Sequence, residues 1–265
     1  MHQLYGIAFS HYVEKARWAL ERFSVPYEDK RYLPFLHIPV IHRVHGGRAG
    51  KTDRASTRYS TPVLRTPSGL VLADSAAIVA YVSETFAGPE DDLYADPEAA
   101  ELEQRFHDVL GVHTRRAAYA FLFERPSLIQ SVIDHNVSRA QARLFRIARP
   151  AAQFGLRRLL RIDEAGVARS THKTRDEFAA MGERLADGRP FLLGERFSAA
   201  DLAFAALAAP ALLPEAYSAW LPPLEELPPR ARALTRELRK TRAGAFVMRL
   251  YREERGRVLG RPSAT

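Results

Sequence analysis

Two short stretches of the chain carry residue types that could hold a ligand. In Thr61-Pro62-Val63-Leu64, a proline comes directly before a short apolar strand. Because proline removes a donor from a strand ladder, this position fits a turn with a cis peptide bond that presents neighbouring backbone groups to a ligand. Asp74-Ser75 opens an apolar helical run, and a helix N-terminus attracts an anion. The two stretches predict a site that grips an extended, carboxylate-bearing peptide by its backbone.

Ser10 is a third place in the chain, besides these two stretches, that could take part in chemistry. It stands where a first apolar strand, Gln3 to Ile7, gives way to a helix that we expect from Ser10 to Arg22. A serine at this place can cap the helix, or its hydroxyl can act on a ligand near the positive end of the helix. Tyr5 is a second hydroxyl close by in the first strand.

The elements around these residues predict an α/β domain over residues 1–87. The first strand and helix are followed by a strand at Tyr27 to Leu33, which gives a β-α-β unit. We expect Pro34 to Ser60 to be irregular. A hairpin then joins the strand after Pro62 to one at Leu70 to Leu72, and a helix runs from Ser75 to Thr85.

The rest of the chain, from residue 96 to 265, predicts an all-helical domain after a polar linker. We expect four long helices, which cover Asp96 to about Glu124, Pro126 to Leu160 with a break at Pro150, Thr171 to Leu185, and Arg230 to Glu254. A shorter buried helix begins near Ser198, where Ser198 and Asp201 form a capping box. We expect Ser198 and Asp201 to be structural rather than catalytic.

Composition limits the class of protein. The chain has 265 residues, 46% of them hydrophobic, which suffices for two domains with cores of their own. It has no cysteine, which excludes disulfides and a cysteine nucleophile. No apolar run is long enough to span a bilayer, and the N-terminus lacks the pattern of a signal peptide, so we expect a cytoplasmic protein without a membrane partner.

The net charge of +8 comes from arginines that are concentrated after Arg139. A basic surface of this kind could bind nucleic acid. We favour a solvated face of long helices instead, because aromatic side chains do not alternate with the arginines in a stacking pattern. His37, His42 and His45 are spaced irregularly, so we expect no metal site.

In four places the chain resembles the cytosolic glutathione transferases, in the right order and spacing. These are the segment from Phe9 to Arg17, Thr61-Pro62-Val63-Leu64, Ala73-Asp74-Ser75, and the segment from Phe197 to Asp201. The resemblance implies a thioredoxin-like N-terminal domain, an all-helical C-terminal bundle, and a homodimer. It also implies conjugation of glutathione, as co-substrate and without another cofactor, to a small hydrophobic electrophile.

The resemblance assigns a role to each candidate residue. Ser10 aligns with the serine that stabilises the glutathione thiolate in serine-type members, and Tyr5 is its rival by likeness to the tyrosine-type enzymes. Such help matters because a free thiol, with a pKa of about 8.5, is only a few per cent ionised at neutral pH. Pro62 and Val63 would hold the cysteinyl unit, and Asp74 with Ser75 the γ-glutamyl end. His11 and Tyr12 could line the second-substrate pocket or pack in the interior.

Two departures from the family pattern concern the glycyl end of glutathione. Ser60 occupies a place where many members have Lys or Gln, and the loop from Pro34 to Ser60 is long. Arg48, Lys51 or Arg58 could supply the missing charge. These departures suggest one alternative to conjugation, a non-catalytic protein-interaction module of the same fold. A second alternative is a glutathione-dependent peroxidase or dehalogenase, which would use the same thiolate with a different pocket in the helical domain.

Overall fold

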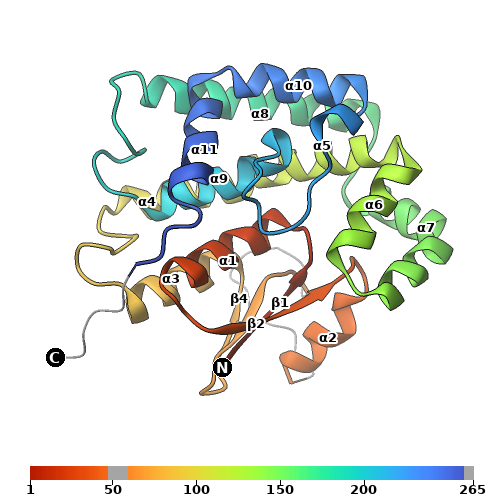
Figure 1. Ribbon diagram of the computed structural model, residues 1–265, viewed down its shortest axis with the longest axis horizontal. Coiled ribbons are helices and arrows are strands. Elements are labelled where there is room, and N and C mark those ends of the chain that lie inside the picture. Colours follow the sequence, from red (N-terminus) through yellow and green to blue (C-terminus); the bar gives the residue numbers. More distant parts are fainter. Residues whose placement is uncertain (47–58, 260–265) are drawn as a thin grey trace.

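The structure is a computed structural model that describes residues 1–46 and 59–259. Its one sheet has the strand order β2-β1-β3-β4 (Figure 1), built from β1 (His2–Ile7), β2 (Tyr27–Tyr32), β3 (Val63–Arg65) and β4 (Val71–Ala73). β1 runs parallel to β2 and antiparallel to β3, and β3 pairs antiparallel with β4. This arrangement confirms the predicted β-α-β unit followed by a hairpin.

Helices cover both faces of the sheet. α1 (His11–Arg22) and α3 (Ser75–Phe86) pack together on the face that meets the helical domain, and α2 (His37–Val44) lies on the other face (Figure 1). Because side chains alternate along a strand, neighbouring residues of β1 enter different cores. Leu4 belongs to the main core with α1, whereas Tyr5 belongs to a smaller core with Ile41 of α2.

The helix α2 corrects our expectation that the whole stretch from Pro34 to Ser60 is irregular. Its sequence contains Pro39, but this residue lies in the first turn, where no backbone N–H is needed within the helix. The side chain of Ile41 is fully buried in the smaller core. Packing against the sheet, rather than helix propensity, therefore stabilises this short helix.

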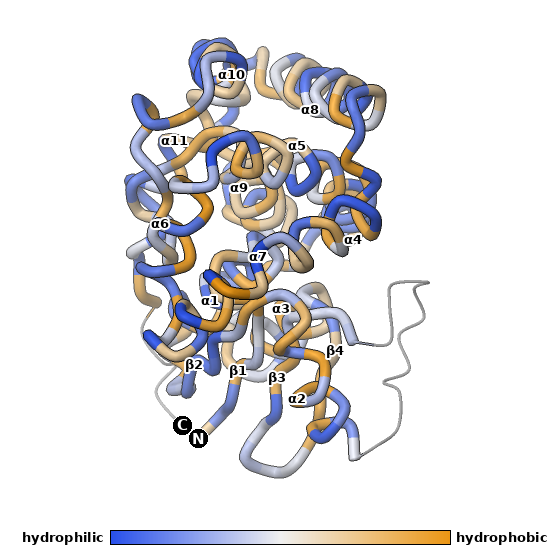
Figure 2. Tube along the Cα trace, turned by 90° about the vertical axis from the view of Figure 1, so that its right-hand side faces the viewer, coloured by the Kyte–Doolittle hydropathy of each residue, from blue (hydrophilic) through white to orange (hydrophobic). Residues whose placement is uncertain are grey.

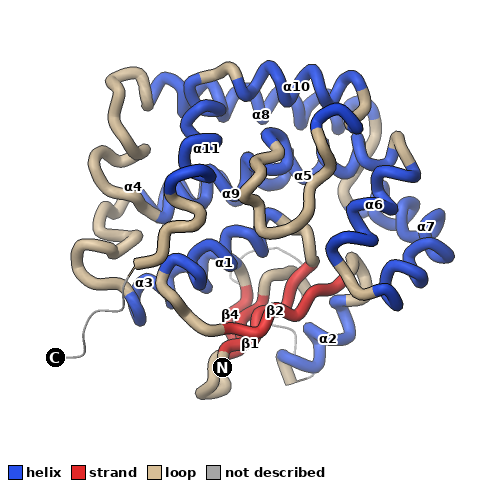
Figure 3. Tube along the Cα trace, in the orientation of Figure 1, coloured by secondary structure: helices blue, strands red, loops and turns tan. Residues whose placement is uncertain are grey.

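The helical domain follows α3, and Figure 3 shows it as helices joined by loops. Its elements are α4 (Glu98–Arg105), the π-helical turn η1 (Phe106–Leu110), α5 (Gly111–Phe123), α6 (Pro126–Asn136), α7 (Arg139–Leu159), α8 (Glu164–Arg184), α9 (Ala199–Leu212), the 3₁₀ turn η2 (Leu224–Glu226), α10 (Pro229–Arg239) and α11 (Arg242–Glu253). No helix of the described residues is long and apolar enough to cross a membrane.

The helix α9 is the centre of this domain. Every residue from Ala199 to Ala209 is buried, and the helix packs against α1, α4, α5, α10 and α11. Figure 2 shows α9 as a largely hydrophobic segment enclosed by the others. A helix that is apolar on all sides must be surrounded in this way.

Two predicted long helices are in fact pairs. The break in the first lies at Val137 and Ser138, where the Ser138 hydroxyl accepts a hydrogen bond from Gln141 N, and not at Pro150, which stays inside α7. Pro150 is exposed, so water can satisfy the carbonyl group that it leaves without a donor. The second predicted helix divides into α10 and α11, where the Thr241 hydroxyl caps Gly244 N at 3.0 Å.

Candidate functional site

A cavity of about 420 Å³ lies where the α/β domain meets the helical domain. The α/β domain contributes the turn from β1 to α1, the start of α2, and residues 59–61. The helical domain contributes mainly apolar side chains from α5, α6, α7, α9 and α10 and from the connection before α10. A concave, mostly apolar site with a few polar groups is typical of small-molecule binding.

Ser10 reaches this cavity from the N-terminus of α1. Its backbone is extended, with φ −75° and ψ 130°, and its carbonyl accepts the first helical hydrogen bond from Glu14 N at 2.9 Å. Its hydroxyl makes no capping hydrogen bond. Because the first backbone N–H groups of a helix carry partial positive charge, an anion is favoured beside Ser10.

The next two side chains of α1 attach this helix to the π-helical turn η1 and the residue after it. The hydroxyl of Tyr12 donates to the carbonyl of His107 at 2.9 Å, and Nε2 of His11 lies 2.9 Å from the carbonyl of Gly111. Gly111 is required here, because a Cβ atom on it would lie 2.4 Å from the Tyr12 hydroxyl oxygen. The two α1 residues line the cavity, and their polar ends bind the helical domain.

His11 is a neutral residue at physiological pH. Burial, followed by the charge of Arg115, lowers its pKa to about 3. Since a carbonyl oxygen can only accept, Nε2 must carry the proton that binds Gly111. These facts favour an orienting and packing function for His11 over proton transfer.

Arg115 brings a formal charge to the cavity. It lies on α5, and among the described lining residues no other Lys, Arg, Asp or Glu is present. Its Nε atom is buried without a hydrogen-bond partner, and its guanidinium lies 5.7 Å from the centre of the Tyr12 ring. Arg115 therefore makes a mostly apolar cavity electropositive.

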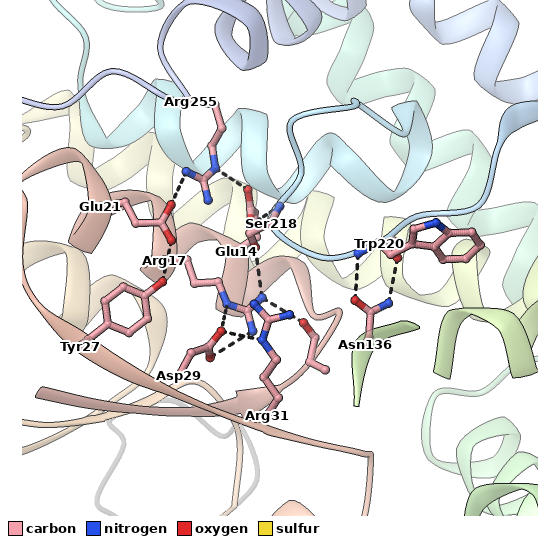
Figure 4. Close-up of polar contacts among 11 residues, drawn as sticks. Glu14, Arg17, Glu21, Tyr27, Asp29, Arg31, Asn136, Ser218, Trp220 and Arg255 are labelled. Atoms are coloured by element: carbon pink, nitrogen blue, oxygen red, sulfur yellow. Dashed lines mark hydrogen bonds and ion pairs between the residues drawn. The ribbon is translucent and has the colours of Figure 1, made fainter. Parts of the chain in front are cut away.

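A buried network holds α1 against the C-terminal part of the chain (Figure 4). Glu14, fully buried, accepts from Arg255 Nε at 2.7 Å and from the hydroxyl and backbone N–H of Ser218. Arg255 also donates to Glu21 at 2.6 Å. Glu14 lies in the first turn of α1, where its charge would oppose an anion at Ser10, and the pairing with Arg255 neutralises this charge.

The turn before Ser10 is held from both domains. Arg17 donates to the carbonyl of Ala8 at 2.9 Å and forms an ion pair with Asp29 of β2 at 3.0 Å. From the connection after α9, the Tyr217 hydroxyl donates to the carbonyl of Phe9 at 3.1 Å. The position of Ser10 is therefore set by buried contacts on both sides of the turn.

The same connection is also fixed to α6. The side-chain amide of Asn136 donates to the carbonyl of Trp220 and its oxygen accepts from Trp220 N, both at 2.9 Å (Figure 4). The ring of His135 stacks on that of Trp220 with 4.2 Å between centres. The segment that carries Tyr217 is thus held by Glu14 at Ser218 and by Asn136 at Trp220.

The Thr61–Pro62 peptide bond is cis, as the sequence predicts. The assignment of Val63 as the ligand-pairing residue does not fit its position. Val63 is 0% exposed and lies inside the sheet, opposite Tyr5 on one side and Ala73 on the other. It is Thr61, on the other side of the proline, that lines the cavity.

Asp74 and Ser75 stand at the N-terminus of α3, next to this turn. Asp74 N donates to the carbonyl of Pro62 at 3.1 Å, and the Asp74 carboxylate caps Ala76 N at 3.0 Å. Asp74 has a φ of 95°, and its Oδ1 lies 3.8 Å from Nδ1 of His107. Ser75 is buried beside it, with its hydroxyl 3.4 Å from Asp74 Oδ1. The predicted pair thus adjoins Pro62 but does not line the described cavity.

Tyr5 lies away from the cavity. Its hydroxyl donates to Oε1 of Gln3 at 2.8 Å, and its ring belongs to the core on the α2 side of the sheet. The structure thus brings Ser10, and not its rival Tyr5, to the cavity wall.

Other predicted residues have structural positions or lie outside the described residues. The capping box is present, with Asp201 accepting from Ser198 N at 2.8 Å and also from Leu192 N at 2.7 Å. Arg48, Lys51 and Arg58, the candidates for the glycyl end, fall in residues 47–58, which are not described.

The residues that sequence reasoning missed are Glu14, Arg17, Arg115, Tyr217 and Arg255. Glu14 and Arg17 are two of five charged residues in the twelve-residue helix α1, so the sequence alone does not single them out. No signal marks Arg115 among the many arginines of the chain either.

Comparison with known proteins bears on both domains. A family model described as glutathione S-transferase, N-terminal domain, matches residues 4–90, and one described as glutathione S-transferase, C-terminal domain, matches residues 164–237. A search of curated proteins gives no significant match.

Solved structures share the fold at low sequence identity. A glutathione S-transferase from Xanthobacter autotrophicus is 17% identical, with a TM-score of 0.61 and coverage of 97% of this chain and 95% of its own. One from Ceriporiopsis subvermispora, solved in complex with glutathione, is 21% identical, with a TM-score of 0.58 and coverage of 99% of each chain. The two family models together span more than half of the sequence, and this chain belongs to the glutathione S-transferase family.

Proposed function

We propose that this protein conjugates glutathione to apolar electrophiles and that the hydroxyl of Ser10 donates a hydrogen bond to the glutathione thiolate. The observation that carries the proposal is the position of Ser10. Ser10 stands at the positive end of α1 and lines a cavity between the two domains, and its hydroxyl makes no capping hydrogen bond. A hydrogen bond and a helix N-terminus both favour the ionised thiol.

The reaction joins the glutathione sulfur to an electrophilic carbon. The thiolate attacks, a carbon–sulfur bond forms, and the bond to the leaving group breaks with its electron pair. Attack on an electron-poor ring places negative charge on the electrophile before the leaving group departs, and Arg115 supplies positive charge in the cavity for it. The apolar side chains of the helical domain would bind the carbon framework.

Glutathione itself would lie along the α/β domain. Thr61 takes the place that we assigned to Val63, since Thr61 faces the cavity beside the cis peptide bond. Asp74 and Ser75 stay the candidates for the γ-glutamyl end, at the N-terminus of α3. The homodimer and the cytoplasmic location also stay predictions.

The test compares Ser10→Ala with Ser127→Ala, a control at an exposed serine of α6. A hydrogen bond to a charged group contributes about 1.5–3 kcal/mol, so we expect Ser10→Ala to lower kcat roughly 10- to 150-fold. The pKa of bound glutathione should rise by about 1–2 units, measured by thiolate absorbance. Retention on a glutathione column should persist.

Three results would contradict the proposal in different ways. Full activity with an unchanged thiol pKa in Ser10→Ala would exclude Ser10 as the activating group. A wild-type protein that neither binds glutathione nor conjugates an aryl halide would favour a non-catalytic interaction module. Binding of glutathione, with turnover of hydroperoxides or haloalkanes but not of aryl halides, would favour the peroxidase or dehalogenase alternative.

A further inference from the structure

The helix α7 carries a basic face with exposed apolar side chains at its centre. Ile147 is 82% exposed and Phe154 is 70% exposed. They are seven residues apart, so they lie on one side of the helix, and Leu144, also exposed, extends the row. We call this surface the α7 face.

Arginines surround this apolar row. Arg143 lies one turn before Ile147, and Arg158 lies one turn after Phe154. The helix also contains Arg139, Arg146, Arg149 and Arg157, and no Asp or Glu occurs from residue 139 to 162. Within residues 1–46 and 59–259, these arginines form one ion pair, the exposed contact of Arg146 with Asp134 at 3.7 Å. The charge of the α7 face is therefore almost uncompensated.

The opposite side of α7 faces the interior. Ala142, Phe145 and Leu156 are buried, and Leu156 lines the cavity. Leu159, which is exposed, lines it as well. Figure 1 places α7 at the outer edge of the molecule. One helix thus joins the outer basic, apolar surface to the site between the domains.

The hairpin formed by α6 and α7 lies outside the segments that the family models match, which are residues 4–90 and 164–237. The α7 face therefore belongs to a part of the chain to which the family match assigns no function.

We propose that the α7 face docks on an anionic lipid bilayer, with Ile147 and Phe154 inserted at the level of the headgroups and the arginines on the lipid phosphates. Helices with basic side chains and exposed Phe and Ile residues bind to the headgroup region of anionic bilayers. A second copy of the chain is a poor occupant, because two α7 faces would bring their arginines together. This docking does not depend on the proposed catalysis, and it revises our interpretation of the arginine-rich segment as a plain solvated face.

Nucleic acid is a weaker fit for this surface. A phosphate backbone would pair with the arginines, but it offers nothing apolar to the row from Leu144 to Phe154. A bilayer satisfies the arginines and the apolar row together. It would also place the cavity next to a reservoir of apolar compounds.

The experiment is flotation of the full chain with vesicles of phosphatidylcholine alone or with 30% phosphatidylserine added. We expect binding to the anionic vesicles that weakens as salt is raised. The double variant Ile147→Ser/Phe154→Ser should bind roughly 10- to 100-fold more weakly. Val258→Ser is the matched control, because Val258 is 61% exposed and lies outside the α7 face, and it should bind like wild type.

Charge is tested by Arg143→Gln/Arg158→Gln, for which we expect a loss of roughly 5-fold per arginine on anionic vesicles. The exchanged side chains are exposed, so the thermal midpoint of each variant should match that of wild type. Equal binding to neutral and anionic vesicles, or binding that survives Ile147→Ser/Phe154→Ser, would overturn the proposal. Two other results would also overturn it. One is tight binding of a DNA duplex that the Ile147→Ser/Phe154→Ser variant retains. The other is a wild-type protein that is dimeric by light scattering and becomes monomeric in the Ile147→Ser/Phe154→Ser variant.

Discussion

His11 makes the stability of this protein depend on pH in a way that a single substitution can isolate. The side chain is 3% exposed, and burial lowers its pKa to about 3 in the folded protein, against 6.5 for an unperturbed histidine. Below pH 6.5 the unfolded chain therefore binds a proton that the folded chain does not. The contribution of the neutral His11 to the free energy of unfolding is therefore fully present above pH 6.5, and it is lost as the pH decreases from 6.5 toward 3.

The size of the effect follows from the shift. Each pH unit below 6.5 costs about 1.4 kcal/mol while His11 stays neutral in the folded state. At pH 5 the loss is about 2 kcal/mol, and at pH 3, where the folded-state His11 is half protonated, it is about 4 kcal/mol.

The variant His11→Gln keeps an amide donor for the Gly111 carbonyl and cannot titrate. Free energies of unfolding would be measured in urea at pH 7.5 and at pH 5.0 for both proteins. Wild type should lose about 2 kcal/mol more than His11→Gln between the two conditions. The other histidines are present in both proteins, so their contributions cancel.

Equal losses in the two proteins would refute this account of His11. The result also bears on the site. If His11 stays neutral at pH 7, it cannot act as a general acid, and the pH profile of conjugation should follow the glutathione thiol alone.

Three further predictions concern residues at the junction of the two domains. Arg255→Met leaves the Glu14 carboxylate buried without its cation and should lower the free energy of unfolding in urea by about 3–5 kcal/mol. Arg175→Met removes one partner of an exposed ion pair and should lower this free energy far less, so similar losses in the two variants would contradict this view. Gly111→Ala forces a methyl group against the Tyr12 hydroxyl and should lower the free energy of unfolding by about 1–3 kcal/mol. Gly88→Ala, where the added methyl group meets open space, should leave this free energy unchanged. An equally stable Gly111→Ala variant would be inconsistent with the docking of α1 on η1. Arg115→Leu should reduce the preference in kcat/KM for a carboxylated aryl halide over its methyl ester by roughly 10-fold, the effect of about 1.4 kcal/mol, and an unchanged ratio would remove Arg115 from substrate recognition.

Features that depend on residues close together in the chain could be predicted from the sequence. The capping box at Ser198 and Asp201 spans four residues, and its hydrogen bonds need only the start of one helix. The cis peptide bond before Pro62 and the hairpin of β3 and β4 likewise follow from local patterns.

The errors have physical causes that the local pattern does not contain. Pro150 was expected to break a helix, but a proline on an exposed side costs less because water reaches the carbonyl that it leaves. The break falls at Ser138, whose capping residue type is a weaker signal than a proline. Val63 was placed on the ligand side of the turn, whereas its ladder partners on both sides enclose it in the sheet.

The alternation of side chains along β1 explains why Tyr5 lies away from the cavity that Ser10 lines. Leu4 faces α1 and the main core, so Tyr5, the next residue, must face α2. The alternation of side chains along β1 could have predicted that Leu4 and Tyr5 face opposite sides of the sheet. Which of these sides faces the cavity depends on where the helical domain packs.

The surroundings of Ser10 show why a residue type at one position does not by itself make a site. The carbonyls of the two residues before it are held by Arg17 and by Tyr217, which is 208 residues away from Phe9 in the chain. The acidic residue in the first turn of α1 is neutralised by an arginine 241 residues away. An α/β domain taken alone would present the same Ser10 hydroxyl on a turn that lacks the Tyr217 contact, beside an uncompensated Glu14. Under the proposed function, the helical domain would therefore support thiolate stabilisation twice, by fixing the turn that carries Ser10 and by neutralising a competing negative charge at the end of the helix.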